Sequence, residues 1–232
     1  LIIPVNFRLN QLVVLKRGGK VVEFMGIVKG GKSKHIELLC DNLRRSSGLT
    51  AILGGVIDIA VFKPNSLLKV LYEKEQQTRA QYNEAIIHSH GALLTLLHQP
   101  PKGYAPIGIN EIDLAILDRG PNDDTVWTSA LRDYSELISN DEKRAQLAMA
   151  RNLEKYVDLA IGINVTPEVA LEREGRTRQG NVMNLPFLRV LYNHYHKLSQ
   201  QAIEQSQPRS LTTPYLDING SGDRDENAQE IY

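Results

Sequence analysis

Short apolar runs alternate with longer stretches of helical spacing along the chain. Apolar runs at residues 11–15 and 20–25 predict two short strands, joined by a turn at residues 16–19. Aliphatic side chains recur at helical intervals in residues 35–45 and predict a helix there. Further buried strands are predicted within residues 50–61 and at residues 112–117, 159–165 and 215–218.

The segments between these strands are expected to be mostly helical. They are residues 65–99, with two or more helices, and residues 125–138, 141–157, 168–173, 185–204 and 223–232. Strands that alternate with helices predict a parallel sheet with helices on both faces. We therefore expect an α/β protein with three layers, formed by one domain over residues 1–232.

Composition narrows the class of protein. Of the 232 residues, 42% are hydrophobic and the formal net charge is zero, so a substantial core is possible and a general nucleic-acid binder is not indicated. The lone Cys40 cannot form an intramolecular disulfide, which suits a reducing, cytoplasmic setting. Residues 1–4 lack the features of a signal peptide, and no apolar run approaches the length of a membrane span.

A glycine-rich loop lies between the strand at residues 20–25 and the helix at residues 35–45. Residues 26–33 match the P-loop pattern, in which backbone N–H groups and a helix N-terminus bind phosphate oxygens. Lys32 would neutralise the β- and γ-phosphates of ATP, and the Ser33 hydroxyl would bind magnesium. A plain glycine turn is the alternative. The predicted nucleotide-binding residues of the loop are Gly26, Lys29, Gly30, Gly31, Lys32, Ser33 and Lys34.

A second acidic position follows the apolar run at residues 112–117. Asp118 ends this run, and an acid at this place can support magnesium beside the P-loop serine. The alternative is an ordinary turn residue, since many strands end in aspartate. Arg119 comes next and could contact an acceptor. Asp123 and Asp124 are better explained as acids that favour a helix N-terminus than as site residues.

A polar loop with several arginines follows the strand at residues 159–165. Arg173, Arg176 and Arg178 lie close together, next to Gly175 and Gly180. Arginines on a closing loop stabilise the charge of a phosphoryl group in transfer. A solvated basic loop is the alternative. We predict a small arginine-containing lid at about residues 173–184.

Four segments together resemble the P-loop nucleoside and nucleotide kinases, especially thymidylate kinase and the deoxynucleoside kinases. They are residues 26–39, Asp118-Arg119, residues 157–178 and residues 215–231. Within the third, residues 158–173 are similar to the strand, Pro-Glu turn and helix that lead into the lid of those kinases. About half of the chain carries the resemblance, and the middle matches poorly.

The resemblance implies a P-loop NTPase fold and a role for each matching residue. It implies that Lys32 binds phosphates, Ser33 binds magnesium and Arg119 contacts the acceptor. The lid would hold Arg173, Arg176 and Arg178, and the base of ATP would lie near Asn219, Gly220 and Ser221. Related kinases are often dimers, so a homodimer is possible.

The chain departs from this family at the acceptor side. The family often has an acid and a proline just after the second strand, where the acid can act as a base on a nucleoside hydroxyl. Here we assign that place to residues 54–59, which hold no such pair, and Asp58 is the nearest carboxylate. Without a clear general base, the hypothesis of a phosphoryl acceptor that is already anionic, such as a phosphate, is favoured. Alternatively, Asp118 could bind the metal and accept the proton.

Two His-x-His pairs and several aromatic residues remain. The pairs at 88–90 and 194–196 lack the set of cysteine and acidic neighbours that binds zinc. We interpret them as surface or capping histidines. Trp127 and Tyr134 could line an acceptor pocket or pack in the core. Tyr192 and Tyr195 are expected to pack on one helix rather than to stack on a base.

The sequence thus predicts a kinase that uses ATP and Mg²⁺ to phosphorylate a small molecule, either a nucleoside, a nucleotide or another metabolite. The rival is a P-loop ATPase or nucleotide-dependent switch with a protein partner. A kinase fold used only for binding is disfavoured by the intact Lys32 and Ser33.

Overall fold

A computed structural model describes residues 3–4, 11–27, 30–45, 57–63, 78–99, 108–135, 137–173, 184–204 and 213–221 of the chain. Within these residues the sheet has six parallel strands, in the order β1-β3-β4-β2-β5-β6. The strands are β1 (Ile3–Pro4), β2 (Gln11–Met25), β3 (Ile59–Phe62), β4 (Gly108–Asp118), β5 (Leu159–Asn164) and β6 (Tyr215–Asn219).

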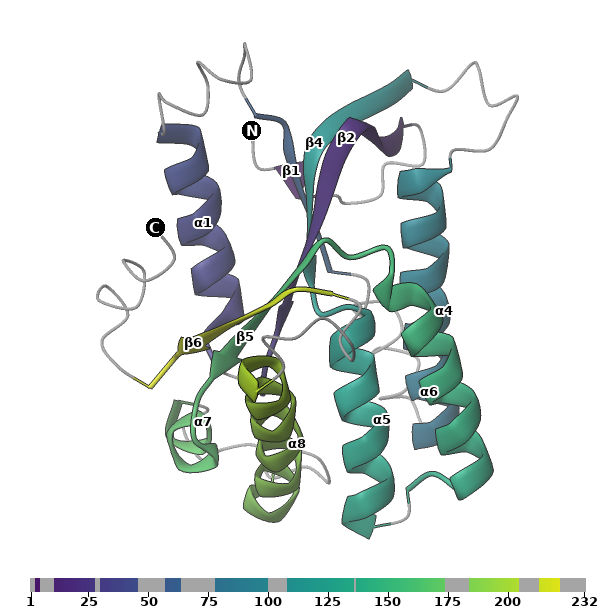
Figure 1. Ribbon diagram of the computed structural model, residues 1–232, viewed down its shortest axis with the longest axis vertical. Coiled ribbons are helices and arrows are strands. Elements are labelled where there is room, and N and C mark those ends of the chain that lie inside the picture. Colours follow the sequence, from purple (N-terminus) through teal and green to yellow (C-terminus); the bar gives the residue numbers. More distant parts are fainter. Residues whose placement is uncertain are drawn as a thin grey trace.

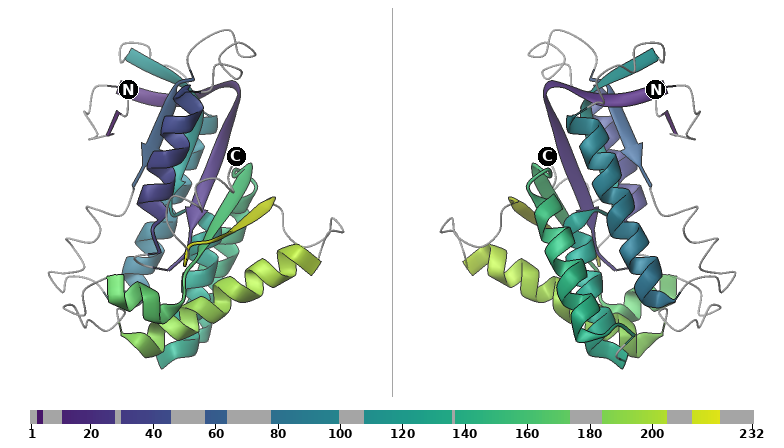
Figure 2. Two further views of the ribbon diagram at one scale, coloured as in Figure 1. Left: turned by 90° about the vertical axis from the view of Figure 1, so that its left-hand side faces the viewer. Right: turned by 90° about the vertical axis from the view of Figure 1, so that its right-hand side faces the viewer.

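Helices cover both faces of this sheet. They are α1 (Lys32–Arg45), α4 (Arg79–His98), α5 (Pro121–Ser135), α6 (Asn140–Glu154), α7 (Pro167–Arg173) and α8 (Leu185–Glu204). Figure 1 shows α1 on one face and α4 and α6 on the other, and the side views of Figure 2 agree. The predicted three-layer α/β fold is confirmed.

The alternation of side chains along each strand produces two cores, one on each face. On β2, Val22 and Phe24 point into a core formed with α1, α5 and α8, whereas Val21 points into a smaller core with α4. The central strand β4 divides its residues in the same way, with Ile116 in the larger core and Leu117 in the smaller one. Both faces of the central strands are therefore buried, which explains their continuous apolar runs.

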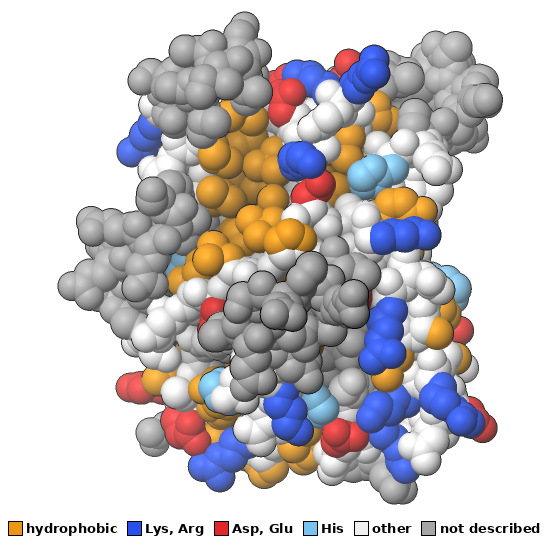
Figure 3. All heavy atoms as spheres, in the orientation of Figure 1, with side chains coloured by type: hydrophobic (Ala, Val, Ile, Leu, Met, Phe, Trp, Pro, Cys, Tyr) orange, Lys and Arg blue, Asp and Glu red, His pale blue; other side chains and the backbone are white. Residues whose placement is uncertain are grey.

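Hydrophobic side chains also reach the surface. In the space-filling view they gather in the middle of the face shown, between segments drawn in grey, while charged side chains lie mostly around its lower rim (Figure 3). None of the helices in the described part of the chain is both long and apolar enough to cross a membrane.

The predicted turn at residues 16–19 is wrong. β2 runs through it, and both halves of the strand pair in parallel with β4, so the chain does not reverse. The register shifts between Leu15 and Lys20, and Gly18 has a φ of 85°. The four polar and glycine residues that suggested a reversing turn form an irregularity within one strand.

Most other expected elements are present with shifted ends. The strand sought within residues 50–61 is β3, which ends at Phe62, and the helix α4 occupies the end of the segment 65–99. The C-terminal helix expected at residues 223–232 and the lid loop after Arg173 lie outside the described residues.

A buried amide network holds α4, α5 and α6 together. The Asn83 Nδ2 donates to Thr128 Oγ1 at 2.9 Å and to Gln146 Oε1 at 2.8 Å. Gln146 donates in turn to the backbone oxygen of Ala80 at 3.1 Å. All three side chains of the network are buried: Asn83, Thr128 and Gln146. Loss of one of them leaves the polar atoms of its partners with neither a hydrogen-bond partner nor access to water.

We predict that Asn83→Ala lowers the free energy of unfolding by about 1–3 kcal/mol, because it leaves buried partners on two other helices unsatisfied. Urea titration followed by circular dichroism measures this change. Asn193→Ala, at an exposed position of α8, is the control and should change stability by less than about 0.5 kcal/mol. Equal stability of the two variants would contradict the structural role given to the network.

Candidate nucleotide-binding site

The P-loop follows β2 directly and leads into α1, as predicted. Gly26 has a φ of 139°, and a Cβ atom added there would lie 2.5 Å from the Ile163 carbonyl oxygen of β5. Gly31 has a φ of 97°. Glycine is thus required at both positions by backbone conformation, and at Gly26 also by the approach of a neighbouring strand. Lys29 lies outside the described residues.

Lys32, the first residue of α1, points back into its own loop. Its ammonium group donates to the backbone oxygens of Gly26 at 2.7 Å and Ile27 at 2.9 Å. Burial, together with the nearby charge of Arg119, lowers the pKa of Lys32 to about 7, against the raising effect of Asp123 and Asp118. The lysine is therefore held inside its own loop, where its pKa is lower than usual.

Ser33 and Asp118 meet across the carboxyl ends of two adjacent strands. The Ser33 hydroxyl donates to Asp118 Oδ2 at 3.2 Å, although 85 residues separate them. Both are hard oxygen ligands, and magnesium is commonly held by one carboxylate, a hydroxyl and phosphate oxygens. The pair predicted from sequence is brought together, and its chemistry fits a magnesium ion.

Lys63 joins this pair from the end of β3. Its ammonium group lies 3.4 Å from both the Asp118 carboxylate and the Ser33 hydroxyl. Lys63 was not among the residues predicted from the sequence, because a single lysine after a strand matches no nucleotide-binding motif. The signal was the Lys63-Pro64 pair after an apolar run, since proline commonly marks the end of an element.

Asp58 cannot act on a phosphoryl acceptor at this site. It precedes β3, at the opposite end of the strand from Lys63, and accepts a hydrogen bond from Lys16 at 2.9 Å. The backbone N–H of Asp58 donates to Asp113 at 2.9 Å. Asp58, the carboxylate nearest to the place assigned to the base, is therefore excluded from that role, and the place was misjudged because β3 was set too early in the chain.

A buried carboxylate lies beneath the P-loop. Asp123, in the first turn of α5, accepts hydrogen bonds from the Gly26 N–H at 3.3 Å, from Arg119 at 2.8 Å and from the Tyr195 hydroxyl of α8. It is 1% exposed. Asp123 does lie at a helix N-terminus, as expected, but it also ties the P-loop to α5 and α8.

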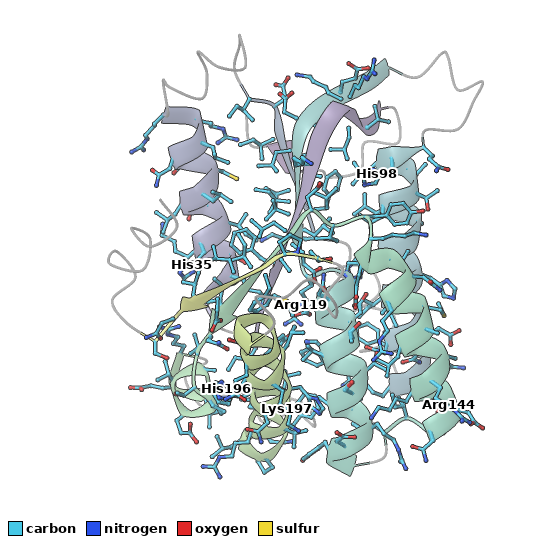
Figure 4. The ribbon with its side chains drawn as sticks, in the orientation of Figure 1. His35, His98, Arg119, Arg144, His196 and Lys197 are labelled. Atoms are coloured by element: carbon cyan, nitrogen blue, oxygen red, sulfur yellow. The ribbon has the colours of Figure 1, made fainter. Side chains whose placement is uncertain are left out.

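The Arg119 side chain is bonded to Asp123 within this cluster. It has a φ of 81°, rare for a residue with a side chain, and its guanidinium lies 4.9 Å from the Trp127 ring centre. Burial opposes its charge, but Asp123, Tyr195 and Asp118 raise its pKa above the usual value. In Figure 4 Arg119 lies near the centre of the molecule, by the start of α5. An acceptor contact would share Arg119 with Asp123.

Two further buried acids, Glu23 and Asp124, lie beside Asp123. Glu23 of β2 accepts hydrogen bonds from the Asp123 N–H at 2.8 Å and the Asn122 side chain at 2.9 Å, and burial raises its pKa to about 7. Asp124 lies 2.7 Å from His90 of α4. Burial lowers the pKa of His90, but Asp124 outweighs it and the net shift is upward.

His90 is fully buried, so the expectation of a surface histidine is wrong at this position. Its neighbour His88 is exposed, with 66% of the side chain accessible. The burial of His90 was not predicted, because its charged partner, Asp124, lies on a helix that is distant in the sequence. No cluster of three metal-ligating acids, histidines or cysteines occurs among the described residues.

Arg173 joins the P-loop to the last strand. Its guanidinium donates to the Gly220 carbonyl at 2.9 Å and lies 3.5 Å from that of Gly30. Asn219 accepts from the Ser221 N–H at 3.0 Å, beside a cavity of about 460 Å³ lined also by Asn164, Tyr192 and Asp217. Arg176 and Arg178 lie outside the described residues. The Arg173 side chain thus brings the P-loop, at Gly30, next to the end of the last strand, at Gly220.

The aromatic residues after Arg119 pack mainly in the core. Trp127 and Tyr134 both contact the buried Phe187, with ring centres 5.5 Å and 5.3 Å away. The Tyr134 hydroxyl donates to Asn184 at 3.1 Å. Tyr195 is buried, as a residue packed against neighbouring helices should be. The core interpretation of Trp127 and Tyr134 is the one that these contacts favour.

The parallel sheet, the glycine loop leading into α1, and the Ser33–Asp118 pair define a three-layer P-loop fold. Solved structures share it: three structures of a deoxyadenosine kinase from M. mycoides align over 91% of this chain and 96% of that one. The structure with bound dCTP has a TM-score of 0.59 at 16% identity. Those with dCMP and dCDP, and with dATP, have 0.60 and 0.56 at 15%. No family model and no curated protein sequence matches.

We predict that ATP binding at pH 8 takes up a proton. Lys32 has a pKa of about 7, so it is mostly neutral at pH 8 in the free protein, and phosphate anions would draw a proton onto it. Because the proton is bound with the ligand, affinity should fall above pH 7, by up to about tenfold per pH unit.

Calorimetry at pH 8 in buffers of different ionisation enthalpy measures this proton uptake. The γ-phosphate is already ionised there and contributes little. Lys32→Arg is the matched control, since its guanidinium keeps its proton and should bind ATP without uptake. Proton uptake of equal size in both proteins would show that Lys32 is not its source.

We predict that Asp123→Asn lowers the free energy of unfolding by about 3 kcal/mol, because it leaves the largely buried Arg119 charge without its partner. Thermal and urea denaturation measure the loss. Asp133→Asn is the control: Asp133 pairs with Lys143 but is 46% exposed, and such a surface pair is worth less than about 1 kcal/mol. Losses of the same size in both variants would contradict a structural role for Asp123.

Proposed function

We propose that this protein is a kinase that transfers the γ-phosphoryl group of ATP to a small molecule, in the class of nucleosides and nucleotides. The observation that carries the proposal is the meeting of Lys32, Ser33 and Asp118 at the carboxyl ends of β2 and β4. Ligands of open parallel sheets bind at that edge.

Each residue has a defined task in this proposal. The N–H groups at the start of α1 and the Lys32 ammonium bind the β- and γ-phosphates, after Lys32 leaves the carbonyl oxygens of Gly26 and Ile27. Magnesium, when bound, would neutralise phosphate charge and would be held by Ser33 and Asp118. Arg173, already beside Gly30, adds positive charge at the same edge.

The base of ATP is proposed to lie near Asn219 and Gly220. The Arg173 guanidinium connects Gly220 to the P-loop. Arg176 and Arg178 are proposed to complete the lid. Exclusion of water by such a lid prevents hydrolysis of ATP in place of transfer.

The fold likeness supports the class of acceptor. The M. mycoides deoxyadenosine kinase structures hold deoxynucleotides, and the likeness runs through almost the whole of both chains. At 15–16% identity this likeness concerns the fold, so the acceptor of this chain has to be established by experiment.

The test is transfer of labelled phosphate from ATP, with magnesium, to a panel of nucleosides, nucleotides and other hydroxylated metabolites. We expect label on at least one acceptor, and a fall of about 100-fold or more in Lys32→Met, since one charged group that stabilises transferring phosphate contributes this much. Lys20→Met should keep full activity, because Lys20 is exposed and bonded to Asp158.

ATP hydrolysis without a labelled acceptor would favour the rival, an ATPase or nucleotide-dependent switch. Binding of ATP with neither transfer nor hydrolysis would favour a binding module. Either outcome would contradict the kinase proposal.

A further inference from the structure

The carboxyl end of β3 presents a cation to the site. Lys63 directly follows the last residue of β3, and 57% of its side chain is exposed. Its ammonium group nevertheless reaches to within 3.4 Å of the Asp118 carboxylate, which is only 15% exposed. One side of the Lys63 ammonium thus faces the proposed phosphate and metal site, and the other side remains open to solvent.

The carboxylates near this edge are already engaged. In the described part of the chain, Glu23, Asp123 and Asp124 are buried and bonded beneath the P-loop, to Asn122, Arg119 and His90. Asp118 receives both the Ser33 hydroxyl and the Lys63 ammonium on a single oxygen, Oδ2.

An ammonium group donates hydrogen bonds and accepts none. The end of β3 therefore offers an approaching acceptor a positive charge and not a proton acceptor. This environment suits an acceptor whose reacting oxygen is already anionic better than one that must first lose a proton from a hydroxyl.

We propose that Lys63 binds a phosphate group of the acceptor, and that the acceptor is therefore a phosphate monoester, of which a nucleoside 5′-monophosphate is the form that suits this fold. This inference rests on the proposed kinase function and deepens it. The M. mycoides enzyme that shares the fold is a deoxyadenosine kinase, so the inference gives the two proteins acceptors of different charge.

The transfer balances without a base. An anionic oxygen of the acceptor phosphate forms a bond to the γ-phosphorus of ATP, and the bond from that phosphorus to the β,γ-bridging oxygen breaks. The electron pair of the broken bond stays on the terminal oxygen of ADP. No proton has to leave the attacking oxygen, so no carboxylate is needed beside it.

Lys63 can change partners at little cost. Its ion pair with Asp118 is longer than a good hydrogen bond, and the lysine is more than half exposed. An ion pair with an exposed lysine contributes little to stability, so breaking it is easy. A phosphate dianion carries more charge than one carboxylate and more acceptor oxygens, so the exposed ammonium gains by turning toward it.

Calorimetry with the full chain tests the inference through binding alone. The protein is saturated with magnesium and a non-hydrolysable ATP analogue, and then titrated with the four common deoxynucleosides and with their 5′-monophosphates. The variants are Lys63→Met, which removes the charge, and Lys63→Arg, which keeps it. Lys143→Met is the matched control, since it removes from α6 a lysine whose ammonium group lies 3.3 Å from the carboxylate of Asp133 on α5.

We expect at least one monophosphate to bind about tenfold or more tightly than its nucleoside. Lys63→Met should remove this preference while changing nucleoside affinity less than about threefold. Lys63→Arg should retain most of it, and Lys143→Met all of it.

Three results would overturn the inference: nucleosides that bind as tightly as monophosphates, a preference that survives in Lys63→Met, or no binding of any monophosphate. Binding of the ATP analogue, measured in the same titrations, separates these results from failure of the kinase proposal. An intact analogue site with no monophosphate preference would leave a kinase with a different acceptor.

Discussion

The buried Asp123 carboxylate makes the interactions on which the candidate nucleotide site depends. It receives a backbone N–H from the first residue of the P-loop, a guanidinium from the residue after Asp118, and a hydroxyl from α8. These three donors come from the ends of β2 and β4 and from a distant helix. One carboxylate thus fixes the relative positions of the loop, the acidic strand end and α8, and Arg119 balances its charge.

The loop above this carboxylate is set by backbone constraints. The positive φ of Gly26 and the close Ile163 carbonyl leave no room for a side chain, and they turn the chain from β2 toward the start of α1. Lys32 then lies among backbone oxygens, at the helix end where phosphate binds best. Burial and the charge of Arg119 lower its pKa, so this position disfavours the charged form of the lysine in the free protein.

Local patterns were enough to predict the three-layer fold, the P-loop and the pairing of Ser33 with Asp118. Short apolar runs and a glycine motif are features of neighbouring residues, and parallel strands bring their carboxyl ends to one edge. Contacts over long distances in the chain were not predictable. The bonds from Asp123 to Gly26 and Tyr195 span 97 and 72 residues, and nothing in the first turn of α5 distinguishes Asp123 from an ordinary acid at a helix start.

Errors in strand boundaries had larger consequences. Placing β3 too early drew attention to Asp58, at the far end of the strand, and away from Lys63 beside Asp118. Because side chains at the two ends of a strand lie on opposite edges of the sheet, a shift of a few residues changes which chemistry reaches the site. The turn expected at residues 16–19 failed because both flanking runs pair with the same strand, β4.

A crystal structure with magnesium and a non-hydrolysable ATP analogue tests the central claim most directly. The account predicts that Lys32 leaves the Gly26 and Ile27 carbonyls for the β- and γ-phosphates, that Ser33 and Asp118 flank the metal, and that the Asp123 cluster stays unchanged beneath them. An analogue bound elsewhere, with Lys32 still on those carbonyls, would contradict it.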